Sequence, residues 1–285
     1  MHHNHKSPIK SGFFNLRHNQ ISTSKGGEII KDTIRKRLYE IEQQQNIRIL
    51  HAVESGSRAW GFASPNSDYD VRFIYAHSPE YYLKLEKTRD VIELPINDVL
   101  DINGWDLDKA LRLLHKSNPT LFEWLASPII YRKTDFADRF APILTEYFNP
   151  QTSIHHYLGT AKSNYMAYIR NRRSVNAKKY FYILRPLLAC KWIMDKQCPP
   201  PMLFSDLKDE YADKSIITDI DYLLDLKIHS QEKQIILAIQ SINDYISDTM
   251  NEIKTYLNSL PKNEPKSWDT LNEFFLSEIT YTAPP

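Results

Sequence analysis

The sequence predicts an α+β protein in which a small mixed sheet with flanking helices is followed by an all-helical region. Short apolar segments that indicate strands fall in the first half of the chain, at about 47–53, 70–75, 91–94 and 99–102. After about Arg132, apolar residues recur at helical spacing instead. The chain has 285 residues, which is enough for one large or two modest domains with proper cores.

The first predicted element is an amphipathic helix that leads into the first strand. Its apolar residues recur at helical spacing between about 28 and 45. In the strand at 70–75, alternate side chains share a face of the sheet. Val71, Phe73 and Tyr75 are therefore expected to point into the core.

A hairpin is predicted between the segments 91–94 and 99–102. The residues that join them, Pro95-Ile96-Asn97-Asp98, have the composition of a turn, with Asp98 as a turn residue. Helix, strand, turn, strand and hairpin in this order describe a small mixed sheet with helices on one side.

A pair of helices follows the hairpin, the first at about 107–116. Asn118 as cap and Pro119 as first helical residue begin the second, which ends before Ser127-Pro128. Pro186 should kink or restart a later helix, because proline cannot donate the i→i−4 hydrogen bond. The later helices are predicted at 135–147, 155–172, 177–196, 205–226 and 232–259.

These elements divide the chain into four predicted segments. The sheet domain spans 26–130 and the helical domain spans 131–260, between a flexible N-terminal tail (1–25) and a C-terminal extension (261–285). The composition is that of a folded soluble protein, with 42% hydrophobic and 25% charged residues.

Hydropathy and cysteine content restrict the cellular location. No run approaches the roughly 18 apolar residues that cross a bilayer, so no membrane partner is expected. With only two cysteines, a disulfide framework is excluded and a reducing compartment, the cytoplasm, is expected.

The charge is balanced in total but uneven along the chain. The formal net charge is +1, which gives no global case for nucleic-acid binding. Between Glu146 and Asp195 there is no acidic residue, whereas basic residues are frequent from 162 to 191. This asymmetry suggests a basic surface suited to phosphates. The basic residues of the segment are Lys162, Arg170, Arg172, Arg173, Lys178, Lys179, Arg185 and Lys191.

Two aspartates behind a Gly-Ser pair give the clearest functional signal. In a strand, Asp68, Asp70 and Arg72 would share the face opposite the core. Two adjacent carboxylates repel each other unless a cation lies between them, and oxygen ligands favour a hard ion such as Mg²⁺. Upstream, Gly56-Ser57 suits a tight turn whose backbone N–H groups and hydroxyl could hold a phosphate. Magnesium and phosphate together are the requirements of nucleotidyl transfer.

The order of an apolar strand, Gly-Ser, a short connection and Asp-x-Asp in a second strand resembles the DNA polymerase β superfamily of nucleotidyltransferases. Longer stretches look like one branch, the predicted nucleotidyltransferases, some of whose members are associated with RNA ligases in RNA repair. The resemblance runs from about Leu50 to about Leu207, with 26–130 as the catalytic domain. The stretches that carry it are 54–72, 103–111, 116–128 and 178–188.

This resemblance implies Mg²⁺-dependent transfer of a nucleoside monophosphate from an NTP such as ATP to a hydroxyl, with release of pyrophosphate. Asp68 and Asp70 would hold two metal ions, either Mg²⁺ or Mn²⁺. A third carboxylate is expected on a neighbouring strand, where it would complete the set of metal ligands and assist deprotonation of the hydroxyl. Asp101 is favoured by strand alternation, whereas its rival Asp106 stands where a helix N-cap would.

The resemblance also implies nucleotide-binding residues. Gly56 and Ser57 would hold the β- and γ-phosphates, with Arg58 either assisting them or serving as an ordinary surface arginine. Glu54 closes the first strand and is expected to orient this loop. The segment Trp60-Gly61-Phe62 is expected to pack rather than to stack on a base.

In polymerase-β-like enzymes a helical second domain often closes over the nucleotide. Here Lys178, Tyr182 and Arg185 share one helical stripe next to Lys179, which could bind triphosphate and stack on a base. The alternative is a solvated basic face that forms salt bridges with the acidic segment after Leu203.

An RNA 3′ end is the favoured acceptor, because of the basic segment 162–191 and the resemblance to RNA-repair proteins. The protein partner is open, with an RNA ligase as one candidate. Two other functions stay in view: adenylylation of a protein or small molecule, and a catalytically silent nucleotide- or RNA-binding module.

Overall fold

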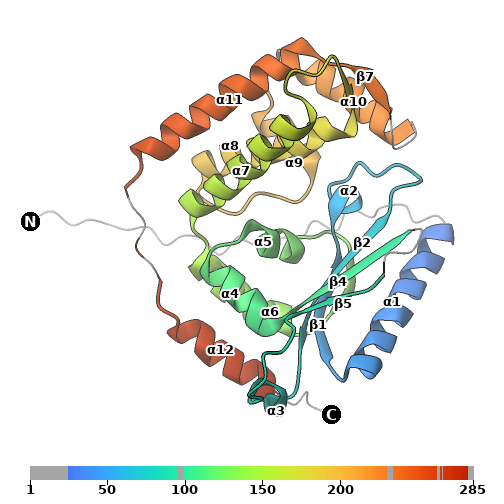
Figure 1. Cartoon of the computed structure of the whole chain (residues 1–285), viewed down its shortest axis with the longest axis vertical. Coiled ribbons are helices and arrows are strands. Elements are labelled where there is room, and N and C mark those ends of the chain that lie inside the picture. Colours follow the sequence, from blue (N-terminus) through green and yellow to red (C-terminus); the bar gives the residue numbers. More distant parts are fainter. Residues whose placement is uncertain (1–24, 96–98, 230–233, 262–263, 265, 282–285) are drawn as a thin grey trace, which may run out of the picture.

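The computed structural model describes residues 25–95, 99–229, 234–261, 264 and 266–281. A sheet with its helices forms one part of the molecule and a group of helices forms the other (Figure 1). The expected α+β class is confirmed. Most of the predicted N-terminal tail and the hairpin turn with Asp98 lie outside the described residues.

The sheet has five strands in the order β3-β4-β2-β1-β5. Strands β2 and β4 are parallel, and the other neighbouring pairs are antiparallel. Four of the strands were predicted, and the edge strand β5 was not. The strands are β1 (Arg48–Glu54), β2 (Tyr69–Ala76), β3 (Val91–Glu93), β4 (Leu100–Asp106) and β5 (Ile130–Lys133).

Helices cover both faces of the sheet, which corrects the expectation of helices on one side. On one face, α1 (Lys25–Gln45) packs its buried apolar residues against Val71, Phe73 and Tyr75, as the alternation predicted. On the other face, Ile74 and Ala76 lie beneath helices that form a second core. Those helices are α4 (Leu107–His115), α5 (Pro119–Leu125), α6 (Phe136–Tyr147) and α12 (Asp269–Thr280).

The two helices that follow β4 begin as predicted. The Asp106 carboxylate accepts a hydrogen bond from the Asp108 backbone N–H and caps α4. Asn118 caps α5 through the Thr120 backbone N–H, with Pro119 as the first helical residue. These side-chain caps satisfy backbone donors that have no partner inside a helix.

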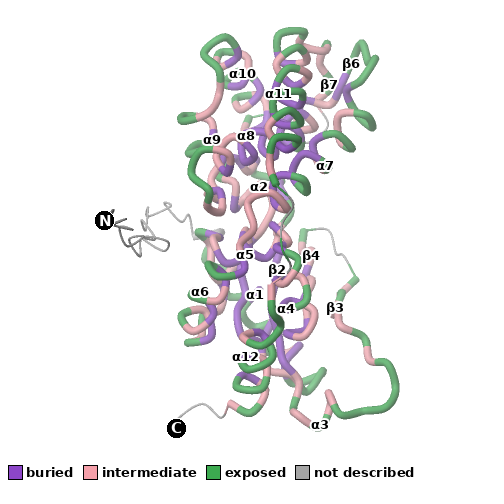
Figure 2. Tube along the Cα trace, turned by 90° about the vertical axis from the view of Figure 1, so that its left-hand side faces the viewer, coloured by how far each residue is buried: buried purple, intermediate pink, exposed green. Residues whose placement is uncertain are grey.

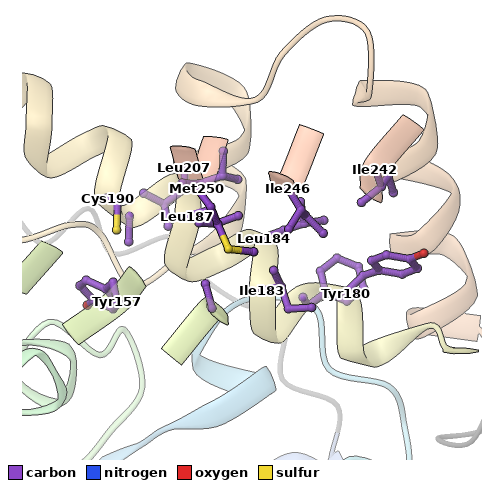
Figure 3. Close-up of a cluster of buried hydrophobic side chains, with 14 of the residues drawn as sticks. Tyr157, Tyr180, Ile183, Leu184, Leu187, Cys190, Leu207, Ile242, Ile246 and Met250 are labelled. Atoms are coloured by element: carbon purple, nitrogen blue, oxygen red, sulfur yellow. The ribbon is translucent and has the colours of Figure 1, made fainter. Parts of the chain in front are cut away.

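The second part of the molecule is built around α8 (Lys178–Lys196), whose residues are buried for most of its length. Figure 3 shows α8 residues such as Leu184 and Leu187 facing Ile246 and Met250 of α11. Pro186 is buried in this helix, which is not restarted there. The neighbouring helices are α7 (Pro150–Tyr168), α9 (Phe204–Tyr211), α10 (Ile217–His229) and α11 (Gln240–Ser259).

Two predictions for this part were wrong. The region is not helical throughout, because β6 (Ser174–Asn176) and β7 (Ile235–Leu237) form a small antiparallel sheet. The predicted helix at 205–226 is two helices, α9 and α10. A turn divides them, in which the Asp213 carboxylate accepts hydrogen bonds from the Ser215 backbone N–H and hydroxyl.

The packing does not follow the predicted boundary at residue 130. Helix α6 lies beyond it but packs with the sheet, and so does α12 in the predicted C-terminal extension. Arg139 of α6 and the buried carboxylate of Glu278 on α12 form two charge-assisted hydrogen bonds of 2.7 and 2.8 Å. In Figure 2, buried residues run through the middle of both parts. None of the described helices combines the length and apolar character needed to cross a membrane.

Candidate active site

The turn after β1 brings Gly56 against Asp70. Gly56 and Ser57 open the short helix α2 (Gly56–Ala59), and Gly56 has a φ of +58°, which favours glycine. A Cβ atom at residue 56 would lie only 2.0 Å from Asp70 Oδ2. The Ser55 backbone N–H donates to the Asp70 carbonyl over 2.8 Å. The Gly-Ser turn and Asp70 of β2 are therefore direct neighbours. They were predicted from separate parts of the sequence.

Asp101 lies beside Asp70 because β2 and β4 are parallel neighbours in register. The Arg72 guanidinium lies between the two carboxylates. Its Nη2 atom is 2.6 Å from Asp101 Oδ2 and 3.2 Å from Asp70 Oδ1. Alternation placed Arg72 on the same face as Asp70 but gave it no role. The structure makes it the counter-ion of both acids.

Asp68 differs from Asp70 in its surroundings. It precedes β2, which begins at Tyr69, and its side chain is exposed. The alternation that was expected to align it with Asp70 therefore does not extend to residue 68.

The charge on Asp70 is disfavoured by its environment. Burial raises the pKa of Asp70, the negative charges of Asp101 and Asp68 raise it further, and Arg72 opposes them. A divalent cation beside Asp70 would relieve this repulsion, and carboxylate oxygens suit Mg²⁺ or Mn²⁺. The donor chemistry fits such an ion, although no group of three or more acidic, histidine or cysteine side chains within the described residues is already gathered as a metal centre.

Glu54, at the end of β1, binds the neighbouring strands β2 and β5 through its carboxylate. It is fully buried, and its Oε1 accepts a 2.7 Å hydrogen bond from the Asp70 backbone N–H. Its Oε2 accepts a hydrogen bond from the Tyr131 hydroxyl on β5. Burial raises the pKa of Glu54 to about 7, against the effect of both hydrogen bonds. Tyr131 was missed because the strand that carries it was not predicted.

Arg58 shapes the loop rather than lying free on the surface. Its Nη2 donates to the Ser67 carbonyl at 2.6 Å and its Nε to the Asp68 carbonyl at 3.1 Å. The guanidinium carbon lies 3.7 Å from the centre of the Tyr69 ring. Neither of the two sequence interpretations foresaw this role, which fixes the backbone next to Asp68.

Arg185 does not lie on the exposed stripe that helical spacing predicted. It is only 2% exposed, and its Nη1 donates to Glu123 Oε1 at 2.7 Å. The Tyr157 hydroxyl donates to the same oxygen at 2.7 Å. The guanidinium also covers the Trp60 ring, 4.8 Å from the ring centre. Arg185 thus joins α8 to α5 and to the turn after α2.

The other residues of the predicted stripe stay near the surface. Tyr182 is 36% exposed and meets the Trp60 ring edge-on, with 5.8 Å between ring centres. The Lys179 ammonium lies 4.0 Å from the centre of the Tyr168 ring and 5.1 Å from that of Tyr182. Lys178 is half-buried, and its backbone N–H donates to the Asn176 side chain.

The basic segment 162–191 is divided between surface and interior. Arg185 pairs with Glu123, and Lys191 lies 3.9 Å from Glu252. Glu123 and Glu252 both lie outside 206–225, the acidic segment after Leu203 that was the alternative partner. The cations with exposed side chains are Lys162, Arg170, Arg172 and Arg173.

The chain is similar to a known family, to a curated protein and to a protein of solved structure. A family described as "RNA repair pathway DNA polymerase beta family" matches residues 30–277. A protein of Bacillus subtilis (strain 168) named "Uncharacterized protein YcgL" is 41% identical over 252 residues, which cover 88% of this chain and 96% of that protein. A nucleotidyltransferase-like protein from Exiguobacterium sibiricum 255-15, of known crystal structure, is 12% identical with a TM-score of 0.30. That match covers 79% of this chain and 75% of the other.

Proposed function

Because this chain belongs to the RNA repair pathway DNA polymerase beta family, we propose that it transfers a nucleoside monophosphate from an NTP to an RNA 3′ hydroxyl. The observation that carries the proposal is the contact of Gly56 with Asp70, whose strand neighbour in register is Asp101. The turn that we propose to bind phosphate therefore lies next to Asp70 and Asp101, two of the acids of the proposed site.

The roles of the residues follow from their positions. Asp68 and Asp70 would hold Mg²⁺, which neutralises developing charge and aligns the attacking and leaving oxygens when bound. The Ser57 hydroxyl and the backbone of Gly56-Ser57 bind the β- and γ-phosphates. Glu54 accepts a hydrogen bond from the backbone N–H of Asp70 and so fixes the position of this residue in the sheet.

The transfer step forms one phosphorus–oxygen bond and breaks another. The 3′ oxygen of the acceptor forms a bond to the α-phosphorus, and the bond from that phosphorus to the β-phosphate oxygen breaks. Pyrophosphate leaves, and the hydroxyl proton passes to the Asp101 carboxylate. Arg72, at 2.6 Å, holds this carboxylate in place as counter-ion.

RNA is the proposed acceptor because the family is described by its RNA repair pathway and because four basic side chains of the segment 162–191 are exposed. One observation favours the silent binding module instead. The Arg72 guanidinium already lies between Asp70 and Asp101 and offsets one of their two negative charges, in the place where a catalytic metal ion would be expected.

The test is incubation with each α-³²P-labelled NTP, Mg²⁺ and RNA that ends in a 3′ hydroxyl. We expect label in RNA, lost in Asp68→Ala/Asp70→Ala and retained in Asp206→Ala/Asp209→Ala, which makes the same change in charge on exposed residues of α9. RNA affinity should fall with added salt. Label in protein or in a small molecule would move the acceptor, and NTP binding without any transfer would support the silent module.

A further inference from the structure

The segment that connects α2 to β2 packs against the helical part of the molecule. The Phe62 ring belongs to the core formed by α7 to α11 and lies 4.7 Å from Phe181 and 5.5 Å from Phe204, between ring centres. The Phe204 backbone N–H donates to the Trp60 carbonyl at 2.9 Å. The expected packing role of Trp60-Gly61-Phe62 is confirmed, and its partner is the helical part rather than the sheet.

A buried lysine reaches the same connection from α10. Lys227 is 8% exposed, and its Nζ atom lies 3.3 Å from Ser64 Oγ and 3.2 Å from Ser67 Oγ. Both serines are buried as well. A buried ammonium is unfavourable unless hydrogen bonds replace its water, and the two hydroxyls supply acceptors for this purpose.

The two serines close the turn that ends at Asp68. The Ser67 backbone N–H donates to the Ser64 carbonyl, and the Ser64 backbone N–H donates to Ser67 Oγ, both over 3.0 Å. On the other side of the turn, Arg58 holds the Ser67 and Asp68 carbonyls. The backbone before Asp68 is thus fixed from the helical part by Lys227 and from α2 by Arg58.

We propose that Lys227 is a positioning residue, through which helix α10 sets the place of the Asp68 carboxylate beside Asp70. Asp68 lies outside β2, so strand pairing does not fix its side chain. The hydrogen bonds of Lys227 to the preceding turn supply the missing restraint from a residue 160 positions away from Ser67. The positional claim stands on these contacts, and only its effect on transfer rests on the proposed function.

Amide hydrogen exchange of the purified full chain tests the positional claim. In Lys227→Met the backbone N–H groups of Ser64 and Ser67 should exchange at least about tenfold faster than in the wild type. Those of Phe73 in β2 should be unchanged. Lys227→Arg should restore protection, because its guanidinium can donate to both hydroxyls, and Lys214→Met, at an exposed lysine of the helical part, should have no effect.

The serine side of the contact gives a second variant. Ser64→Ala/Ser67→Ala removes the hydroxyls that Lys227 contacts and also the acceptor of the Ser64 backbone N–H, so exchange in this turn should rise at least as far as in Lys227→Met. Adding Lys227→Met to the serine variant should raise exchange no further, since the lysine then has no hydroxyl in this turn to restrain. Unchanged exchange at Ser64 and Ser67 in Lys227→Met, with the chain folded, would overturn the proposal. Additive effects of the two variants would overturn it too.

Transfer kinetics distinguish the positional claim from a purely structural contact. If Asp68 is displaced, Lys227→Met should require at least about tenfold more Mg²⁺ for half-maximal rate, and excess Mg²⁺ should restore the rate. A loss of rate that Mg²⁺ does not restore would overturn the link to Asp68. If exchange responds as expected while the wild type transfers nothing to any acceptor, the positional claim holds and the proposed function fails.

Discussion

The two ends of strand β4 carry the same residue type in opposite settings. Asp101, near the start of the strand, is partly exposed, pairs with Arg72 and faces Asp70. Asp106, at its end, is buried, caps α4 and accepts a hydrogen bond from the Tyr82 hydroxyl over 2.9 Å. Burial raises the pKa of Asp106 to about 7. An acid of this strand therefore stays partly exposed at one end and is buried as a helix cap at the other.

The same contrast holds along β2. Ile74 and Ala76 on its second half lie under the helices, whereas Asp70 and Arg72 on its first half share their face and remain partly exposed. This end of the sheet also receives the Gly-Ser turn. Substitutions at the uncovered end should therefore affect transfer, and those at the covered end should affect stability.

The largest effect is expected from Asp70→Ala at the uncovered end. Loss of this carboxylate should lower the transfer rate by about a thousandfold or more, the scale on which preorganised electrostatic groups act on a transition state. Thermal unfolding should change little or shift upward, because a carboxyl whose charge is disfavoured by burial is removed. If the variant keeps more than a tenth of the wild-type transfer rate, the uncovered end of the sheet does not carry the function.

The covered part of β1 should show its own dependence on pH. Burial lowers the pKa of His51 to about 4, so the folded state binds fewer protons than the unfolded state between about pH 4 and 6.5. Stability from this group is present above pH 6.5 and lost as the pH falls. Relative to His51→Gln, the wild type should lose about 3 kcal/mol between pH 7 and 4, measured by urea unfolding. If the free energies of unfolding of the two proteins changed in parallel with pH, the lowered pKa of His51 would be contradicted.

Gly56→Ala tests the contact that joins the turn to Asp70. The added Cβ would overlap Asp70 Oδ2 and would require a strained backbone, so we expect about a hundredfold loss in kcat. Gly159→Ala in α7 is the matched control, because a Cβ there meets nothing within 4 Å. The control should leave kcat unchanged and stabilise the helix by about 0.5–1 kcal/mol. Equal kcat values for the two variants would show that the contact is not needed.

The smallest effect on transfer is expected at the covered end of β4. Asp106→Ala removes the cap of α4 and the partner of Tyr82, and should lower the free energy of unfolding by about 1–2 kcal/mol. The rate per folded molecule should stay within about threefold of the wild type, since a cap contributes to stability rather than to chemistry. A large loss of rate with unchanged stability would make Asp106 the third catalytic carboxylate.

Local pattern was enough to predict four of the five strands of the sheet, and the family resemblance supplied the expectation of a third carboxylate on a neighbouring strand. Alternation in β2 and β4 placed Asp70, Arg72 and Asp101 on compatible faces, and the register of parallel strands then brought them together. Strand β5 was missed because its four residues between Pro128 and Thr134 carry no distinct alternation. Tyr131, which lies on this strand and donates a hydrogen bond to Glu54, was missed for the same reason.

The errors in the helical part have a different cause. Helical spacing predicted that Arg185 shares a stripe with Tyr182, but α8 is surrounded by neighbours, so charge alone did not mark its exposed face. The pairs Arg185–Glu123 and Lys227–Ser67 join residues 62 and 160 positions apart. No local pattern in the sequence predicts such contacts, because they depend on how whole elements pack.

Helix α12 has a consequence for the order in which the protein can fold during synthesis. The Arg48 guanidinium donates to the Glu278 carbonyl across 230 residues, and Arg139 binds the Glu278 carboxylate. On the ribosome, the sheet and its first helices are made before α7 to α11, yet their core is closed by a helix made after them. Apolar surface of α4 and α6 that α12 covers in the folded protein therefore stays uncovered while the helical part is synthesised, which predicts that this core closes late.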